Sequence, residues 1–251
     1  MIKKVKIGVK KLSEAIALVS IELLILFIAF FISLTLLIVV IRKIFIIKQD
    51  SFDFHVFDYL LQFITPTNTA IMKFFTIFGS HFFLFPAYFV ILSYYFFVKK
   101  KKWYAIKVLT VGLSNFLLLF GLKFFFDRPR PLIPLLKHVP GLSFPSGHAF
   151  MSFTFFGIII YLIYKDVSNK WVKWVSIFLL FVMIFMVGLS RVYLRVHYAS
   201  DVIGGYCFGV ITLIILFLML GQVEKYNEKK LPARLNITEP DEKPQAASHK
   251  G

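Results

Sequence analysis

The first long apolar run of the chain reads IELLILFIAFFISLTLLIVV, residues 21–40. Glu22 is its only charged residue, and a helix of about 20 residues spans the ~30 Å hydrocarbon core of a bilayer. Further runs follow at 82–98 and 202–220. Continuous apolar runs of this length are typical of transmembrane helices, whereas the strands of a membrane barrel are shorter and alternate in polarity. The runs therefore predict an all-α integral membrane protein.

The composition agrees with this prediction. The 251 residues are 59% hydrophobic and include 32 Phe, and the mean hydropathy is +0.79. A soluble domain of this length would need more polar surface. A secretory signal peptide would have a shorter apolar run than residues 21–40 and a cleavage site between small residues. We therefore expect this run to be retained as the first span.

The same patterns predict the organisation of the whole chain. We expect a basic cytoplasmic N-terminus at 1–19, a six-helix membrane domain at 20–222 and a disordered cytoplasmic tail at 223–251, where the sequence is polar and of mixed charge. Residues 49–73 separate the first two spans, and their apolar side chains recur at helical spacing. This spacing predicts an amphipathic helix on the membrane surface. The six spans are expected at 20–42, 74–98, 103–125, 147–164, 172–190 and 199–221.

The charge distribution predicts orientation rather than nucleic-acid binding. The formal net charge is +16, but the lysines cluster beside apolar runs, at 3–11 and 99–102. This is the positive-inside pattern, so we expect a bilayer and no nucleic acid as partner, and the sequence leaves the oligomeric state open. Segments 43–73, 126–146 and 191–198 then lie on the non-cytoplasmic side. They still carry Arg and Lys, which indicates that these cations have a function there.

Few residues are available to bind a metal. Between residues 62 and 223 the carboxylates are Asp127, Asp166 and Asp201, and Asp166 falls in a predicted cytoplasmic turn. A two-metal phosphoryl-transfer site needs several converging carboxylates, and no Cys/His grouping has the spacing of a zinc site. The single cysteine lies in the last apolar run, where we expect it to pack. The sequence therefore predicts chemistry without a metal or cofactor.

Three polar clusters border the predicted spans on the non-cytoplasmic side. Each lies at the edge of an apolar run, where a charged side chain is energetically costly and is seldom retained without a function. Because the clusters share one membrane face, we expect them to form one site. They are KFFFDRPRP at 123–131, FPSGHAF at 144–150 and SRVYLRVHYASD at 190–201.

The first property of these clusters is an excess of cations. Lys123, Arg130 and Arg191 bring positive charge to one membrane surface, and arginine forks match the oxygens of phosphate. Ser146 and Gly147 precede an apolar run, as at the start of a helix. The free N–H groups of a helix N-terminus bind anions, and glycine permits close approach. The expected ligand is a phosphate group.

Two histidines could then act on that phosphate. His197 and Asp201 are four residues apart at the start of the last span, so they share a helical face. The carboxylate can hold one ring nitrogen and leave the other free to attack phosphorus, forming a phosphohistidine. His148 could protonate the leaving oxygen and later activate water. We therefore predict that these three residues are catalytic.

The three clusters resemble the motifs of the type 2 phosphatidic acid phosphatase family, which are K-x6-R-P, P-S-G-H and S-R-x5-H-x3-D. All three match without departure at 123–131, 145–148 and 190–201, and the resemblance covers roughly residues 50–222. It implies a six-helix, metal-independent membrane phosphatase or diphosphatase that acts on lipid phosphates or pyrophosphates. Together with the charge pattern, we expect an enzyme of a bacterial membrane with its active site on the non-cytoplasmic side. The resemblance also implies that His197 is the nucleophile supported by Asp201. The residues that would hold phosphate are Lys123, Arg130, Ser146, Gly147, His148 and Arg191.

The sequence leaves the substrate and two other functions open. Candidate substrates are phosphatidic acid, phosphorylated lipid A, phosphatidylglycerol phosphate and a polyprenyl diphosphate such as undecaprenyl diphosphate. Phosphatidylglycerol phosphate and the polyprenyl diphosphate are the leading candidates. A haloperoxidase-like enzyme could bind vanadate at the same anion site, although six spans argue against it. A non-enzymatic membrane protein could bind anionic lipid there, although a transporter would place its charges nearer mid-membrane.

Several other residues have more than one interpretation. Arg128, Lys137 and Arg195 either extend to lipid head groups or belong to the site. The histidines at 55, 81 and 138 are expected to be structural. The small-residue spacing of Gly204, Gly205 and Gly209 predicts close helix packing in the last span.

Overall fold

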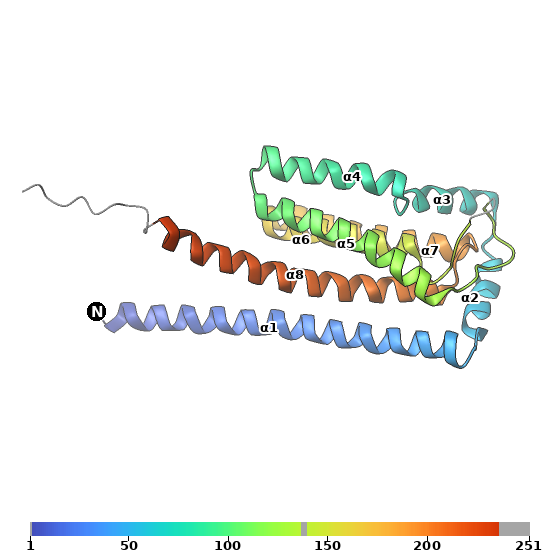
Figure 1. Ribbon diagram of the computed structural model, residues 1–251, viewed down its shortest axis with the longest axis horizontal. Helices are drawn as coiled ribbons and strands as arrows, with labels where there is room; N and C mark the ends of the chain where they lie inside the picture. Colours follow the sequence, from blue (N-terminus) through green and yellow to red (C-terminus); the bar gives the residue numbers. More distant parts are fainter. Residues whose placement is uncertain (1, 137–139, 236–251) are drawn as a thin grey trace, which may run out of the picture.

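The computed structural model describes residues 2–136 and 140–235, with side chains described from residue 21 to 228. Every regular element in the described ranges is a helix, and the helices form an elongated bundle (Figure 1). In chain order they are α1 (Ile2–Ile41), η1 (Arg42–Ile46), α2 (Ser51–Leu61), α3 (Pro66–Ile77), α4 (His81–Ser93), η2 (Tyr94–Val98), α5 (Lys102–Phe126), α6 (Gly147–Asp166), α7 (Lys170–Tyr193) and α8 (Ala199–Leu235).

Six of these segments are long and apolar enough to cross a membrane, which confirms the predicted all-α membrane bundle. α2 lies across one end of the bundle, as expected for a surface helix, and buries one face through Phe57 (Figure 1). The six spans are Ile21–Ile46, His81–Val98, Lys102–Phe126, Gly147–Asp166, Lys170–Tyr193 and Ala199–Glu228.

Two boundaries differ from the prediction. The expected span at 74–98 is divided, because residues up to Ile77 belong to α3 and α4 begins only at His81. A Cβ atom on the intervening Gly79 would lie 2.6 Å from Val187, so the chain crosses close to α7 there. The surrounding phenylalanines continue through the break, so hydropathy gave no sign of it.

The expected end of the membrane domain at residue 222 also lies within a helix, since α8 continues to Leu235. Residues 223–235 of the predicted disordered tail are therefore helical. The remaining tail residues, 236–251, lie outside the described residues, and so do Lys137 and His138.

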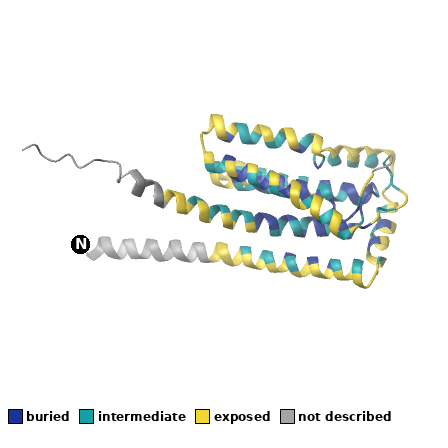
Figure 2. Cartoon of the chain, viewed as in Figure 1, coloured by how far each residue is buried: buried dark blue, intermediate teal, exposed yellow. Residues whose placement is uncertain are grey.

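The core of the bundle surrounds α6. Half of its span is buried, a larger share than in any other span, and buried residues gather on α6 and on the adjoining part of α8 (Figure 2). Glycines let α8 approach closely, as predicted: a Cβ on Gly205 would lie 2.9 Å from the carbonyl oxygen of Ser146. Gly204 and Gly209 similarly face the rings of Phe144 and Phe153. This packing fixes the start of α8 against the start of α6.

The connections between helices gather at the two ends of the bundle. α2, the loop residues 127–136 and 140–146, and the turn at 194–198 lie at one end, whereas the start of α1 and the α4–α5 turn lie at the other (Figure 1). The fold therefore brings all three polar clusters to the same end, as the sequence predicted.

Candidate active site

Lys123 and Arg130 are held by backbone carbonyls around the loop that follows α5. The Lys123 ammonium donates to the carbonyl oxygen of Leu142 at 2.9 Å. The Arg130 guanidinium donates from Nε to the carbonyl of Gly141 at 3.0 Å and from NH1 to that of Val196 at 2.8 Å. Neutral carbonyls orient these two cations without neutralising them.

Arg191 completes the cationic cluster from the last turn of α7. Its guanidinium is buried and donates from NH1 to Oγ1 of Thr76 at 2.6 Å, and its Nε has no hydrogen-bond partner among the described residues. Coulombic interactions couple Arg191 to Arg130 and both of them to Lys123. No ion pair joins any of the three to a carboxylate in the described part of the chain. Partly buried cations that lack an opposite charge are costly, so this cluster is a candidate anion site.

The start of α6 adjoins these cations. Ser146 is the buried N-cap residue, and its hydroxyl accepts from the N–H of Ala149 at 3.5 Å. Its own N–H donates to the carbonyl oxygen of Asp201 at 3.0 Å, which joins α6 to α8. A Cβ on Gly147 would lie 3.8 Å from Cε of Lys123. The first-turn N–H groups, which have no intrahelical acceptor, therefore lie beside a cation.

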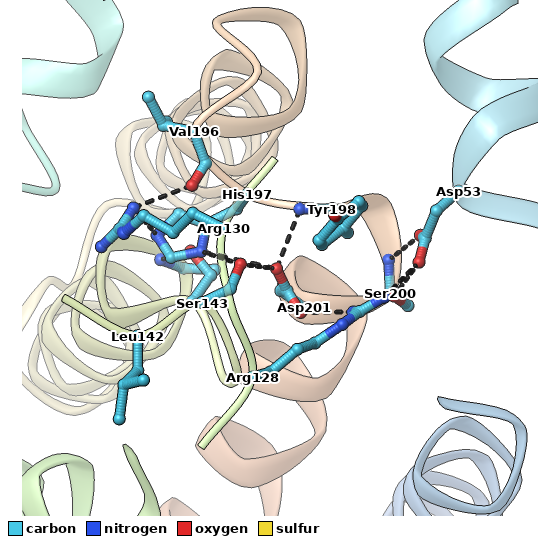
Figure 3. A network of polar contacts seen from close by, with 12 residues as sticks. Asp53, Arg128, Arg130, Leu142, Ser143, Val196, His197, Tyr198, Ser200 and Asp201 are labelled. Atoms are coloured by element: carbon cyan, nitrogen blue, oxygen red, sulfur yellow. Dashed lines mark hydrogen bonds and ion pairs between the residues drawn. The ribbon is translucent and has the colours of Figure 1, made fainter. Parts of the chain in front are cut away.

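His197 lies in the turn before α8, with one nitrogen facing the cations. Its Nε2 is 3.2 Å from NH1 of Arg130, and because a guanidinium only donates, Nε2 must be the unprotonated nitrogen. Nδ1 then carries the proton, 3.6 Å from Oδ2 of Asp201 and 3.4 Å from Oγ of Ser143. The Ser143 hydroxyl donates to the same carboxylate oxygen (Figure 3). The lone pair of His197 is thus directed at the cation cluster.

Electrostatics keep this imidazole neutral. Burial lowers the pKa of His197 to about 3. The Asp201 carboxylate raises this pKa, but by less than desolvation and the positive charges of Arg191 and Arg130 lower it. Burial also lowers the pKa of Arg130 below its usual value. A neutral imidazole has the nucleophilic lone pair that attack on phosphorus requires.

His148 is in the first turn of α6. A Cβ on Gly79 would lie 3.0 Å from its Cδ2 atom, so the ring occupies space beside the α3–α4 turn. Coulombic interactions also link the ring to His197 and to the three cations. The structure therefore brings together all eight site residues predicted from the sequence.

Arg128 is a further site residue whose role the sequence left open. It is buried, so it does not extend to lipid head groups. Its NH1 donates to Oδ1 of Asp201 at 2.6 Å and to Oγ of Ser200 at 2.8 Å. Its NH2 donates to Asp53 at 2.9 Å and to Asp50 at 3.0 Å, both from the α2 region. Asp50 and Asp53 therefore lie near the site, although they precede the segment 62–223 in which the sequence showed only three carboxylates.

The other residues left open lie outside this network. Arg195 is partly exposed, with its guanidinium 5.3 Å from the ring centroid of Phe57. His55 is on α2, where Nδ1 contacts the carbonyl oxygen of Ser51 at 2.5 Å, and His81 packs against Phe82. No group of three or more His, Cys, Asp or Glu side chains is arranged to hold a metal ion among the residues described.

Fold and site together define a class, that of helical membrane proteins with a cluster of cations beside a histidine–aspartate pair. The chain belongs to the PAP2 superfamily, whose sequence profile matches residues 103–225. It is 35% identical to phosphatidylglycerophosphatase B of Bacillus subtilis over 162 residues, which are 64% of this chain and 77% of that protein.

Two solved structures are similar to the chain. The crystal structure of a transmembrane PAP2-type phosphatidylglycerolphosphate phosphatase from Bacillus subtilis has a TM-score of 0.68 at 27% identity, over 77% of this chain and 96% of that one. That of LpxE from Aquifex aeolicus has a TM-score of 0.50 at 28% identity, over 65% of this chain and 93% of that one. The chain is an integral membrane lipid phosphatase, which sets aside the non-enzymatic alternative.

Proposed function

We propose that the protein hydrolyses phosphatidylglycerol phosphate to phosphatidylglycerol and inorganic phosphate through a phosphohistidine at residue 197. The observation that carries the proposal is the arrangement, around the Nε2 lone pair of His197, of cations that pair with no carboxylate of the described residues. The choice of substrate is supported by the relatives named for phosphatidylglycerol phosphate. A terminal phosphate monoester has three charged or partly charged oxygens, which the cluster can neutralise.

In the first step, Nε2 of His197 forms a bond to phosphorus while the bond from phosphorus to the ester oxygen breaks. His148 enters this step as an imidazolium and donates its proton to that oxygen, so phosphatidylglycerol leaves as an alcohol and His148 becomes neutral. Positive charge then develops on the phosphorylated imidazole. The Asp201 carboxylate, 3.6 Å from Nδ1 and bridged to it by Ser143, stabilises this charge.

In the second step, His148 accepts a proton from water while the water oxygen forms a bond to phosphorus. The bond from phosphorus to Nε2 breaks, and its electron pair returns to a neutral His197. Inorganic phosphate leaves, and both histidines regain their starting states. Fixed cations stabilise the transition state of each step, because the phosphoryl oxygens occupy the same site in both.

The lipid chains of the substrate would occupy an apolar groove between α4 and α5. The groove has a volume of about 440 Å³ and is lined by Tyr88, Phe89, Gly112, Leu113, Phe116 and Met151. Met151 follows His148 by less than one turn of α6, so the groove begins close to the site. A lipid phosphate could therefore place its head group among the cations and a hydrocarbon chain on the membrane-facing surface.

We further propose that the site faces the non-cytoplasmic side. The lysines at 99–102 and the N-terminus lie at the opposite end of the bundle from the site (Figure 1). Under the positive-inside rule that opposite end is cytoplasmic. The basic residues that break the rule at the site end include Arg128, Arg130 and Arg191, and each of them has partners in or beside the site.

The test is phosphate release by purified protein in EDTA from four substrates: phosphatidylglycerol phosphate, phosphatidic acid, undecaprenyl diphosphate and a phosphorylated lipid A. We expect turnover without metal, with the highest kcat/KM for phosphatidylglycerol phosphate. A preference for undecaprenyl diphosphate would overturn the substrate and keep the mechanism. Loss of activity in EDTA that Mg²⁺ restores would overturn the mechanism. A parallel assay of halide oxidation by peroxide with added vanadate tests the haloperoxidase alternative, for which we expect no activity.

A further inference from the structure

Arg128 differs from the other arginines of the site in what it contacts. Its guanidinium is buried and bonds to the carboxylates of Asp50, Asp53 and Asp201, and it packs 4.1 Å from the ring centroid of Tyr198. Burial alone would lower the pKa of Arg128, but Asp201 and Asp53 outweigh it and raise the pKa. Both terminal nitrogens of the guanidinium are therefore engaged with acids, which leaves Arg128 poorly suited to bind phosphate.

The bonds of Arg128 fix one side of the Asp201 carboxylate. NH1 binds Oδ1 of Asp201, whereas Oδ2 accepts from the Ser143 hydroxyl and the N–H of Tyr198 and faces Nδ1 of His197 (Figure 3). A carboxylate held at both oxygens cannot rotate about its last bond. The orientation of Oδ2 toward His197 therefore depends on what holds Oδ1.

Arg128 is in turn held by the surface helix. Asp53 of α2 is buried, and its Oδ2 accepts from NH2 of Arg128 at 2.9 Å and from the hydroxyl of Ser200 at 2.5 Å. Its Oδ1 accepts from the N–H of Ser200 at 2.8 Å, in the first turn of α8. Asp50 bonds to the same NH2 group at 3.0 Å, but its side chain is 46% exposed. Solvent screens an exposed pair, so Asp53 is the stronger anchor.

We propose that Arg128 is a positioning residue for hydrolysis, held by Asp53 of α2, and that it sets the orientation of Asp201 toward His197. The inference rests on the proposed function, because it assigns Asp201 to the support of a histidine nucleophile. It extends the site beyond the residues that face phosphate, to a surface helix more than 70 residues away in the chain. Because Asp53 holds Arg128 and Arg128 holds Asp201, turnover depends on the position of α2 at the end of the bundle.

The test compares Asp53→Asn with Asp50→Asn, a matched pair because both carboxylates bond to the same nitrogen of Arg128. For Asp53→Asn we expect kcat to fall about 10-fold or more, since charge-assisted bonds to a buried group are lost. The inhibition constant of inorganic phosphate should stay within about 2-fold of wild type, because the phosphate-facing cations are untouched. Asp50→Asn should keep kcat within about 2-fold.

Arg128→Lys is the second variant, because it keeps the charge and avoids leaving two buried carboxylates unpaired. One ammonium cannot bond to Asp201, Ser200 and Asp53 with the geometry of a guanidinium, so we expect kcat to fall while phosphate inhibition is retained. The inference is overturned if Asp53→Asn keeps wild-type kcat, if Asp50→Asn loses as much, or if phosphate binding falls together with kcat. Failure of wild-type protein to release phosphate would instead overturn the proposed function.

Discussion

Arg130 donates a hydrogen bond from its guanidinium to Nε2 of His197, across 3.2 Å. The contact joins a residue that would bind phosphate to the nitrogen that would attack it. A guanidinium has no lone pair to accept with, so the bond defines which imidazole nitrogen is unprotonated. A phosphoryl oxygen bound by Arg130 would therefore bring phosphorus close to the nucleophile.

Arg191 should contribute a hydrogen bond, as well as its positive charge, to phosphate binding. Its buried Nε is free to donate to a phosphoryl oxygen while NH1 is held by Thr76. In Arg191→Lys the charge remains, but this second donor is lost, so KM and the inhibition constant of phosphate should rise about 10-fold or more. Arg195→Lys is the control, because Arg195 contacts the ring of Phe57 and should leave both constants within about 2-fold. Equal effects of the two variants would contradict the assignment.

The depressed pKa of His197 predicts the pH dependence of stability. The imidazole has a pKa of about 3 when folded and about 6.5 when unfolded, so the unfolded chain binds the extra proton. Its contribution to the free energy of unfolding is full above pH 6.5 and is lost as pH falls from 6.5 toward 3. Thermal unfolding in detergent should therefore show a steeper loss of stability between pH 7 and 5 for wild type than for His197→Gln. Identical slopes would mean that His197 is not buried in its neutral form.

The close approach of α8 to the start of α6 predicts sensitivity at Gly205. In Gly205→Ala the new Cβ would lie 2.9 Å from the carbonyl oxygen of Ser146, a backbone atom that cannot swing away. We expect stability to fall by about 1–3 kcal/mol and kcat to fall with it, because the first turn of α6 is displaced. Gly221→Ala, on the same helix with open space around it, is the control and should behave as wild type. Denaturant titration and initial rates measure the two effects.

The groove between α4 and α5 predicts a substrate-dependent effect. Gly112→Phe should fill the space in front of Tyr88, so kcat/KM should fall about 10-fold for a long-chain lipid phosphate and change little for a short-chain, soluble one. Gly121→Phe adds the same ring elsewhere on α5, where nothing lies within 4 Å of the new Cβ. It should leave both substrates unaffected. If Gly112→Phe impairs both substrates equally, the groove does not hold the lipid chain.

The helical class and the grouping of the site could be predicted from sequence because they depend on local signals. Apolar runs of membrane length define the spans. Lysines cluster at the connections on one membrane face, so the other connections are assigned to the opposite face. Motif residues such as Lys123 and His148 lie at span edges, so membrane topology alone brings them to one end. The break between α3 and α4 was missed, because Gly79 and Ser80 interrupt the helix within an otherwise continuous apolar stretch.

The network around Arg128 could not be predicted, because it depends on contacts between distant segments. Asp53 bonds to Arg128 and Ser200 across 75 and 147 positions in the chain. The sequence shows Asp53 only as a polar residue of an amphipathic helix. The nearest sequence signal for Arg128 was its place two residues before Arg130. Ser143 was missed for a similar reason, since its hydroxyl becomes significant only between His197 and Asp201.

If Nε2 of His197 is the nucleophile, it becomes phosphorylated during turnover. Purified protein is mixed with lipid carrying ³²P in the terminal phosphate, quenched with alkali within the first turnover, and digested for mass spectrometry under alkaline conditions. We expect label on His197, stable in alkali and lost in acid, and no label at that position in His197→Ala. Label on His148 or another residue, or full turnover by His197→Ala, would contradict it.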